Sequence, residues 1–252
     1  TPTPSSAASD VYKRQDVKLA NDSQPFNLSF FENEIVSITG LIGSGKTALA
    51  SQIFGLNPDP NVTMTLNGNS YSPQTPEHAI SAGVFMCPKD RASNAVVSEF
   101  DISNNLALPF FKRHSRLSFI RNKSLTQNAR NSINELGIVC QSEMDSVTTL
   151  SGGNQQKVMV GRWLAEDSSV LLLDEPFQGV DIKARRDIGH QIRSTSRQRA
   201  TIIFVAELDE ALEIADRVIV LHEGNLVGDY QNKSKNVPKI VSSFSGSANN
   251  LD

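Results

Sequence analysis

The hydrophobic positions of the chain fall into short apolar runs that alternate with segments of helical spacing. Apolar runs of strand length cover residues 34–39, 62–66, 84–87, 170–173, 201–205 and 217–222. Continuous runs of this kind are typical of strands buried on both faces of a parallel sheet. Helices are predicted at residues 46–54, 154–165, 182–198 and 208–215. This alternation indicates an α/β layered fold with a mainly parallel sheet.

The pattern changes in the middle of the chain, between residues 91 and 150, where the strand signals vanish. Ala129, Ile133 and Leu136 recur there at helical spacing, and Gly137 follows them as a stop signal. We therefore expect an inserted helical subdomain at about residues 92–150.

The two ends of the chain differ from the region between them, residues 16–230, which we expect to form the main domain. Residues 10–15 match a translation of the transposon adaptor used to fragment DNA for sequencing, and low-complexity sequence precedes them. We expect residues 1–15 to be a non-native extension derived from this adaptor and exclude them from the prediction of the fold; a native polar extension is the alternative. Residues 231–252 are rich in Asn, Ser and Lys, so they are expected to be disordered or loosely docked.

The most informative local sequence is GLIGSGKT at residues 40–47, between a predicted strand and a predicted helix. Its glycines let successive backbone N–H groups converge on phosphate oxygens, and this strand–loop–helix context is that of a phosphate-binding loop. We expect the phosphates to contact Gly40, Gly43, Ser44, Gly45, Lys46, Thr47 and Ala48. Lys46 is expected to reach the β- and γ-phosphates, and Thr47 to bind Mg²⁺. The alternative is an ordinary glycine-rich turn with a solvated lysine.

Two adjacent carboxylates, Asp174 and Glu175, follow the apolar strand at residues 170–173. Ligands of parallel sheets bind at the carboxyl ends of the strands. Asp174 is therefore expected to hold Mg²⁺, and Glu175 to orient and deprotonate the water that attacks the γ-phosphate. The alternative is a charged strand end that merely meets solvent.

A third motif, LSGGNQQK at residues 150–157, resembles the signature sequence of ATP-binding cassette (ABC) proteins. The resemblance implies a P-loop NTPase core of RecA-like type, with the signature carried by the helical subdomain. It also implies that Ser151, Gly152, Gly153 and Gln155 bind the nucleotide of a different cassette. A serine cap followed by two glycines exposes the N–H groups that such a contact requires. Ser151 is also suited to be the ordinary cap of the helix at residues 154–165, and the two roles are compatible.

One consequence of the family geometry is that a single cassette does not close its own ATP site, so a second cassette is an expected partner. ATP would hold two cassettes together and hydrolysis would release them. Residues 179–181 resemble the loop that signals across such a dimer, with Asp181 as its carboxylate. Because the amino-terminal residues look foreign, an amino-terminal cassette of this protein is expected to be missing from the sequence, and the second cassette is either this missing half or another copy of the chain.

The resemblance narrows to the carboxyl-terminal cassette of tandem monosaccharide-importer ATPases over approximately residues 24–229. It rests on residues 72–84, 88–91 and 102–106, together with the asparagine and two glutamines of the signature. The implied function is ATP hydrolysis that powers sugar uptake at the cytoplasmic face of the inner membrane. The implied partners are permease subunits and, indirectly, a periplasmic or extracellular solute-binding protein.

The sequence departs from the family pattern at two positions. Lys89 stands where most cassettes carry a glutamine near Mg²⁺ and the attacking water, so we place it in the nucleotide site. Ala206 stands where most carry a histidine that contacts the γ-phosphate. Both departures are common in carboxyl-terminal sugar-importer cassettes, but they weaken the expectation of fast turnover.

A non-catalytic module that supplies Ser151 to a partner is therefore the first alternative. A non-transport cassette acting on ribosomes or DNA is the second, and the absence of heptads disfavours it.

Composition adds limits on partners and cofactors. The net charge is only −3, so no global basic field favours nucleic acid, and the basic residues between 112 and 123 are interpreted as a solvated face. The apolar runs are too short to span a membrane. Cys87 and Cys140 lack metal-type spacing and are predicted to be reduced structural thiols, and the histidines are scattered. Phe26, Phe30 and Phe31 are the nearest candidates to stack on adenine, but their alternation suits core-facing strand positions better.

Overall fold

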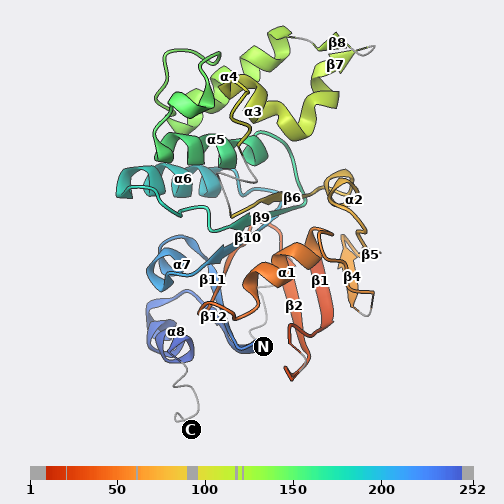
Figure 1. Ribbon diagram of the computed structural model, residues 1–252. Coiled ribbons are helices and arrows are strands. Elements are labelled where there is room, and N and C mark those ends of the chain that lie inside the picture. The colour runs from red at the N-terminus through yellow and green to blue at the C-terminus, as the bar shows by residue number, and fades with distance from the viewer. Residues whose placement is uncertain are drawn as a thin grey trace. The chain divides into compact units, whose positions relative to one another are not determined.

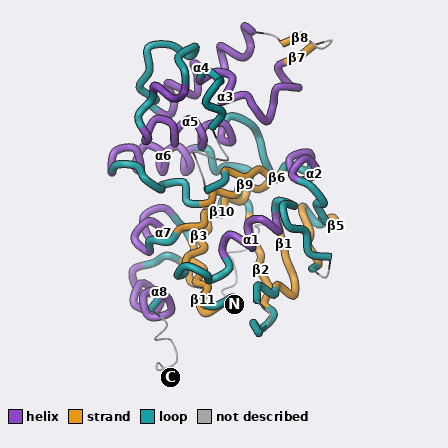
Figure 2. The backbone as a smooth tube through the Cα atoms, viewed as in Figure 1, coloured by secondary structure: helices purple, strands orange, loops and turns teal. Residues whose placement is uncertain are grey.

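The computed structural model describes residues 10–20, 22–60, 62–89, 96–116, 119–120 and 122–245. The chain divides into two compact units. The first, here called the sheet unit, consists of Thr1–Met86, Ser168–Glu175 and Ser196–Asp252. The second, here called the helical unit, consists of Cys87–Asp167 and Pro176–Thr195. Figures 1 and 2 show the elements of each.

A six-stranded sheet with the order β12-β11-β3-β10-β9-β6 runs through the sheet unit. Its strands are β3 (Ile35–Thr39), β6 (Val84–Cys87), β9 (Val170–Asp174), β10 (Ala200–Val205), β11 (Arg217–His222) and β12 (Asn225–Gln231). The pairings β9·β10, β10·β3 and β3·β11 are parallel, whereas β12 runs antiparallel to β11. Every residue of β3, β9 and β10 is buried. The predicted α/β fold with a mainly parallel sheet is therefore confirmed.

Helices bury the apolar faces of these strands, which explains why the strand sequences are continuously hydrophobic. α1 (Lys46–Ile53) contacts β9 and β10, and α7 (Leu208–Ile214) contacts β3 and β10. Leu49 and Ile53 on α1 are fully buried in the same core cluster as Ile38 and Leu172. This packing holds the amino-terminal end of α1 directly after the loop that follows β3.

A second, four-stranded sheet with the order β2-β1-β4-β5 also lies in the sheet unit. Its strands are β1 (Asp10–Val17), β2 (Phe26–Phe31), β4 (Thr63–Leu66) and β5 (Asn69–Ser70), and the short α2 (Pro76–Ser81) comes after them. The pairings that the structure gives for this sheet are antiparallel. Leu28 and Phe30 of β2 are buried, which agrees with a core-facing role for this strand.

Residues 10–15 precede the expected main domain at residues 16–230, but they belong to the strand β1 (Asp10–Val17). β1 pairs with β2 on one side and with β4 on the other, and its Tyr12 and Val17 are fully buried. The hydrogen bonds of a strand join backbone atoms and therefore do not depend on the type of side chain. Residues 11, 12, 14 and 17 of β1 are buried. The non-native origin of residues 1–15 stays an expectation, and residues 1–9 lie outside the described part.

Arg14 on β1 is a charged side chain in a buried position. Arg14 is fully buried, and its Nε and Nη1 have no hydrogen-bond partner among the described residues. Only its Nη2 donates a hydrogen bond, to Oε1 of Gln52. Burial lowers the pKa of Arg14, although the phenol of Tyr12 and the carboxylate of Asp59 act in the opposite direction.

Residues 231–252 were expected to be disordered or loosely docked, but the described part of this region, up to residue 245, is ordered and packed. The strand β12 continues to Gln231, a 3₁₀ turn spans Ser234–Asn236, and α8 (Val237–Phe244) follows. α8 packs on β11 and β12 with Ile240 fully buried, because its few apolar residues share one face. Residues 246–252 lie outside the described part.

The helical unit is built from α3 (Ile102–Ala107), α4 (Asn122–Leu136), α5 (Gly152–Leu164) and α6 (Ile182–Ser194). Shorter elements are the 3₁₀ segments Leu108–His114 and Val147–Thr149 and the β7 (Ser115–Arg116) and β8 (Phe119–Ile120) pair. Ile102, Leu106, Ala129, Leu136 and Val158 form its core. The unit is larger than the predicted subdomain at residues 92–150, because α5 and α6 belong to it as well.

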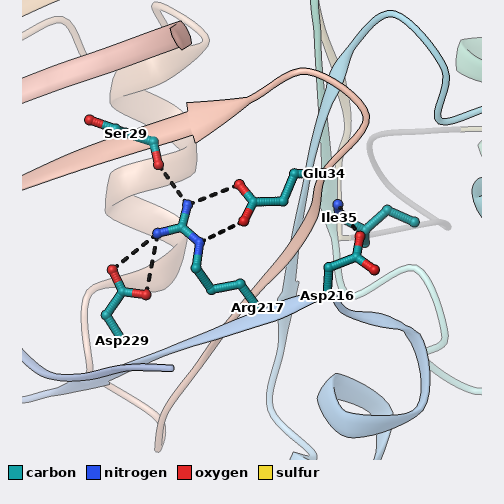
Figure 3. Close-up of polar contacts among 6 residues, drawn as sticks. All are labelled: Ser29, Glu34, Ile35, Asp216, Arg217 and Asp229. Atoms are coloured by element: carbon teal, nitrogen blue, oxygen red, sulfur yellow. Dashed lines mark hydrogen bonds and ion pairs between the residues drawn. The ribbon is translucent and has the colours of Figure 1, made fainter. Parts of the chain in front are cut away.

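A buried arginine joins the two sheets of the sheet unit (Figure 3). Arg217 on β11 donates through Nε and Nη2 to Glu34 at 2.8 and 3.1 Å, and through Nη1 to both oxygens of Asp229 at 3.2 and 3.0 Å. Its Nη2 also donates to the backbone oxygen of Ser29 on β2 at 2.6 Å. Burial alone would lower the pKa of Arg217, but the hydrogen bonds and charges of Glu34 and Asp229 raise it.

Candidate nucleotide site

The parallel register brings the predicted sheet-unit residues to one edge of the sheet. Thr39 on β3 pairs with Val205 on β10, and Phe204 pairs with Asp174 on β9. The loop after β3, the carboxylates at the end of β9 and the residue after β10 therefore lie at the same carboxyl edge. This is the edge at which parallel α/β sheets bind ligands.

The loop between β3 and α1 has the backbone geometry of an anion site. Gly40, Gly43 and Gly45 have φ values of 155, 85 and 96°, which favour glycine. A Cβ on Gly40 would lie 2.1 Å from the backbone oxygen of Leu221, so the loop approaches β11 more closely than a larger residue allows. Gly45 is the N-cap of α1 and has no side chain to cap it. The first N–H groups of α1 are thus available to an anion.

The side chains of this loop suit a phosphate and a hard metal ion. Lys46 is buried, and its Nζ donates a hydrogen bond to the backbone oxygen of Gly40, which places the ammonium against the loop. The hydroxyl of Ser44 is buried without a partner among the described residues, so the loop holds a polar atom that a phosphate oxygen would satisfy. Thr47 and Ala48 are exposed at the start of α1. These residues fit the roles predicted for them.

Glu175 is held in an unusual conformation at the end of β9. Its φ is 50°, which is uncommon for a residue other than glycine, and its side chain is buried. Its N–H donates to the backbone oxygen of Phe204 at 2.8 Å, and its Oε2 accepts from the N–H of Ala206 at 3.2 Å. Asp174 beside it is also buried. Oxygen ligands from Asp174 and Thr47 are of the type that Mg²⁺ prefers.

Ala206 contributes a contact that the sequence reasoning missed. Its side chain makes no hydrogen bond, but its backbone N–H fixes the carboxylate of Glu175. A contact made by a backbone N–H does not depend on residue type, so the sequence carries no local signal of it. The strand register, which places Ala206 after β10 and beside β9, is the feature that could have indicated this contact.

The signature residues lie in the helical unit, at the start of α5. Ser151 is the N-cap, and its Oγ accepts hydrogen bonds from the N–H of Asn154 at 3.5 Å and from its Nδ2 at 3.1 Å. Gly152 and Gly153 form the first turn, and Nε2 of Gln155 donates to the backbone oxygen of Leu150 at 3.1 Å. The predicted helix-cap role of Ser151 is thus confirmed, and the predicted nucleotide contact stays a prediction.

The remaining predicted site residues are also in the helical unit. Asp181 caps α6, where its Oδ1 accepts from the N–H of Ala184 at 2.8 Å. Lys89 is exposed directly after β6. The structure therefore gathers the phosphate loop, Asp174 and Glu175 in one unit, and Lys89, the signature and Asp181 in the other.

Cys87 is a buried thiol, and burial, followed by the charges of Asp145 and Glu143, raises the pKa of the Cys140 thiol. Among the described residues, His, Cys, Asp and Glu form no cluster of three or more suited to a metal ion. Within the same residues, every helix is too short or too polar to cross a membrane. The side chains of the basic residues 112–122 lie outside the described part.

Comparison with known proteins assigns the family. A model of the ABC transporter family matches residues 23–178, which include the phosphate loop, the signature and both carboxylates. The chain belongs to the ABC transporter family. Its fold is that of solved ABC cassettes: a nucleotide-free ATP-binding cassette is similar with a TM-score of 0.78 at 16% identity over 93% of this chain and 96% of that one. A dimeric cassette bound to ADP and phosphate has a TM-score of 0.72 at 18% identity over 88% and 99%.

Several curated relatives are named as import ATP-binding proteins. The chain is 33% identical to an arabinose import ATP-binding protein of Pectobacterium atrosepticum over 90% of this chain and 45% of that protein. It is 36% identical to a xylose import ATP-binding protein of Thermoanaerobacter pseudethanolicus, over 85% and 43%. A ribose import ATP-binding protein of Rubrobacter xylanophilus is 34% identical over 84% and 41%. The chain thus spans less than half the length of the curated relatives that it matches.

Proposed function

We propose that this chain is an ATP-binding and ATP-hydrolysing cassette of an ABC importer for a sugar or sugar-like solute. The cassette works with a second cassette and with permease subunits at the cytoplasmic face of the cell membrane, and indirectly with a solute-binding protein. The names of the arabinose, xylose and ribose import relatives support the solute class. The resemblance to the carboxyl-terminal half of tandem importers supports the arrangement with a second cassette.

The observation that carries the proposal is the placement of an anion-binding loop and a buried glutamate at one edge of a parallel sheet. The N–H groups of the loop and the ammonium of Lys46 bind the triphosphate. Thr47 and Asp174 are suited to hold Mg²⁺, which neutralises the charge that develops on the phosphates. Glu175 orients the attacking water and accepts its proton.

A second candidate function has its own observation in favour. The carboxylate of Glu175 is engaged by the N–H of Ala206, at the position where most cassettes carry a histidine side chain. A cassette without that histidine is suited to a regulatory half, which keeps its own nucleotide and completes a partner's site through Ser151. The two functions differ in whether Glu175 is needed for turnover.

The test compares Glu175→Gln with the unchanged protein, alone and with the partner cassette. We expect Glu175→Gln to bind Mg-ATP as before and to lose ATP turnover by about 100-fold or more, because a general base contributes on that order. Binding is measured by calorimetry and turnover by phosphate release. Glu223→Gln is the matched control, since Glu223 also follows a parallel strand and has a φ of 47°.

The outcome separates the alternatives. Unchanged turnover in Glu175→Gln, together with its loss in Ser151→Ala, would establish the regulatory half and overturn the catalytic proposal. Failure of the unchanged protein to retain Mg-ATP at millimolar concentration would overturn both functions.

A further inference from the structure

Two consecutive polar side chains of the signature helix α5 are buried, and each binds a different neighbouring segment. Gln156 is 1% exposed and Lys157 is 4% exposed. Nε2 of Gln156 donates to the backbone oxygen of Pro176 at 2.9 Å. A buried amide and a carbonyl that satisfy each other form a persistent contact, because breaking it would leave both groups without partners.

Pro176 is the residue immediately after Glu175, so this contact acts one peptide bond away from the proposed general base. Glu175 is fixed on its other side by Phe204 and Ala206, which bind its N–H and its carboxylate. Its φ of 50° is a conformation that surrounding contacts must maintain. Gln156 is in a position to supply one of these constraints.

Lys157 attaches α5 to α6, the helix that follows the segment from Pro176 to Asp181. Its Nζ forms an ion pair with Asp187 of α6 at 2.7 Å and donates to the backbone oxygen of Gly137 at 3.0 Å. Because α6 begins directly after its cap Asp181, the chain is attached to α5 at Pro176 and again at Asp187, inside α6. The hydrogen bond of Gln156 and the ion pair of Lys157 therefore allow α5, residues 176–181 and α6 to move together.

We propose that Gln156 is a positioning residue that couples the signature helix to Glu175. The inference rests on the proposed function, in which the start of α5 engages the nucleotide of the partner cassette. A displacement of α5 on that engagement shifts Pro176 through the Gln156 hydrogen bond, and with it the backbone that sets the carboxylate of Glu175. Gln156 touches no reacting atom in this scheme.

The test replaces Gln156 by methionine, which has a similar length and packs well but donates no hydrogen bond. Three quantities are measured on the full chain in the presence of its partner cassette: Mg-ATP affinity, kcat at saturating ATP, and hydrogen exchange of the peptide covering residues 174–180. We expect an affinity within about two-fold of the unchanged protein, a kcat at least ten-fold lower, and faster exchange of this peptide. Asn232→Leu is the matched control, because it also removes a side-chain amide that donates to backbone oxygens, at 2.8 Å to Leu212 and Ala215.

The control is expected to keep its kcat and the exchange of residues 174–180 even if its melting temperature falls. Normal exchange in Gln156→Met would overturn the inference, and so would faster exchange without a fall in kcat. Loss of Mg-ATP affinity in this variant would also overturn it, since Gln156 would then act on binding. Failure of the unchanged chain to bind Mg-ATP would instead overturn the proposed function, and the exchange comparison would still decide whether Gln156 holds the segment.

Discussion

At the scale of single residues, Glu175 combines a left-handed backbone with a buried carboxylate, and backbone atoms of Phe204 and Ala206 bind both. Lys46, Thr47, Asp174 and Glu175 were predicted from residue type and spacing, and the strand register brings the segments that carry them to one edge. The left-handed conformation of Glu175 and its contact with Ala206 were not predicted. These features depend on backbone atoms of strands that are distant in sequence, so residue types do not encode them locally.

Arg14 is a residue whose local environment contradicts its chemistry. A buried guanidinium with unpaired nitrogens costs more in desolvation than it regains in hydrogen bonds. We expect Arg14→Met to raise the free energy of unfolding by about 1–3 kcal/mol, because an apolar side chain fills the same space without that cost. Denaturant unfolding measures the change, and Gln15→Met, at an exposed position of the same strand, is the control. A less stable Arg14→Met protein would show that the bond to Gln52 outweighs the burial of the charge.

At the scale of elements, the prediction succeeded where apolar pattern alone decides the structure. The buried strands β3, β9, β10 and β11 were located almost to the residue, and so was α5. β1 was missed because its sequence looked foreign, and α8 because Asn, Ser and Lys surround its short apolar face. Both elements are stabilised by tertiary contacts that a local reading of composition does not include.

The joint between α5 and α6 provides a prediction at this scale. The side chain of Lys157 is 6% exposed in its ion pair with Asp187, whereas that of Arg130 is 59% exposed in its pair with Glu143. Lys157→Met should lower the free energy of unfolding by about 1–3 kcal/mol, since a buried charged hydrogen bond is lost. Arg130→Met should leave the melting temperature unchanged, because water screens and replaces an exposed pair. Equal losses in the two variants would contradict this assignment.

At the scale of the whole molecule, long-range polar contacts were beyond prediction. Arg217 binds Ser29, which lies 188 residues away in the sequence, so the spacing of the network residues carries no signal of the network. The two-unit division was foreseen only in outline. The boundary differs from the predicted one because α5 and α6 contribute to the helical unit through packing with α3 and α4.

The Arg217 network provides the prediction at this scale. Arg217→Met leaves two carboxylates without their cation and removes the hydrogen bond from β11 to Ser29 on β2, so we expect a loss of about 3–5 kcal/mol in the free energy of unfolding. Arg217→Lys should recover only part of this loss, because an ammonium is unable to bind two carboxylates with paired hydrogen bonds. Thermal and urea unfolding test both variants. Exposed Arg197→Met is the control, and full recovery by lysine would contradict the geometric argument.

The position of β1 inside its sheet has a practical consequence. A strand flanked by β2 and β4 is held mainly through main-chain pairing on both sides, and only its inward residues must be compatible with the core. A version of the chain that starts after Val17 would leave a gap between the edges of β2 and β4, into which a synthetic peptide with the inward-facing residues of β1 would insert. The protein is thus a natural starting point for a split reporter in which an added peptide restores the fold.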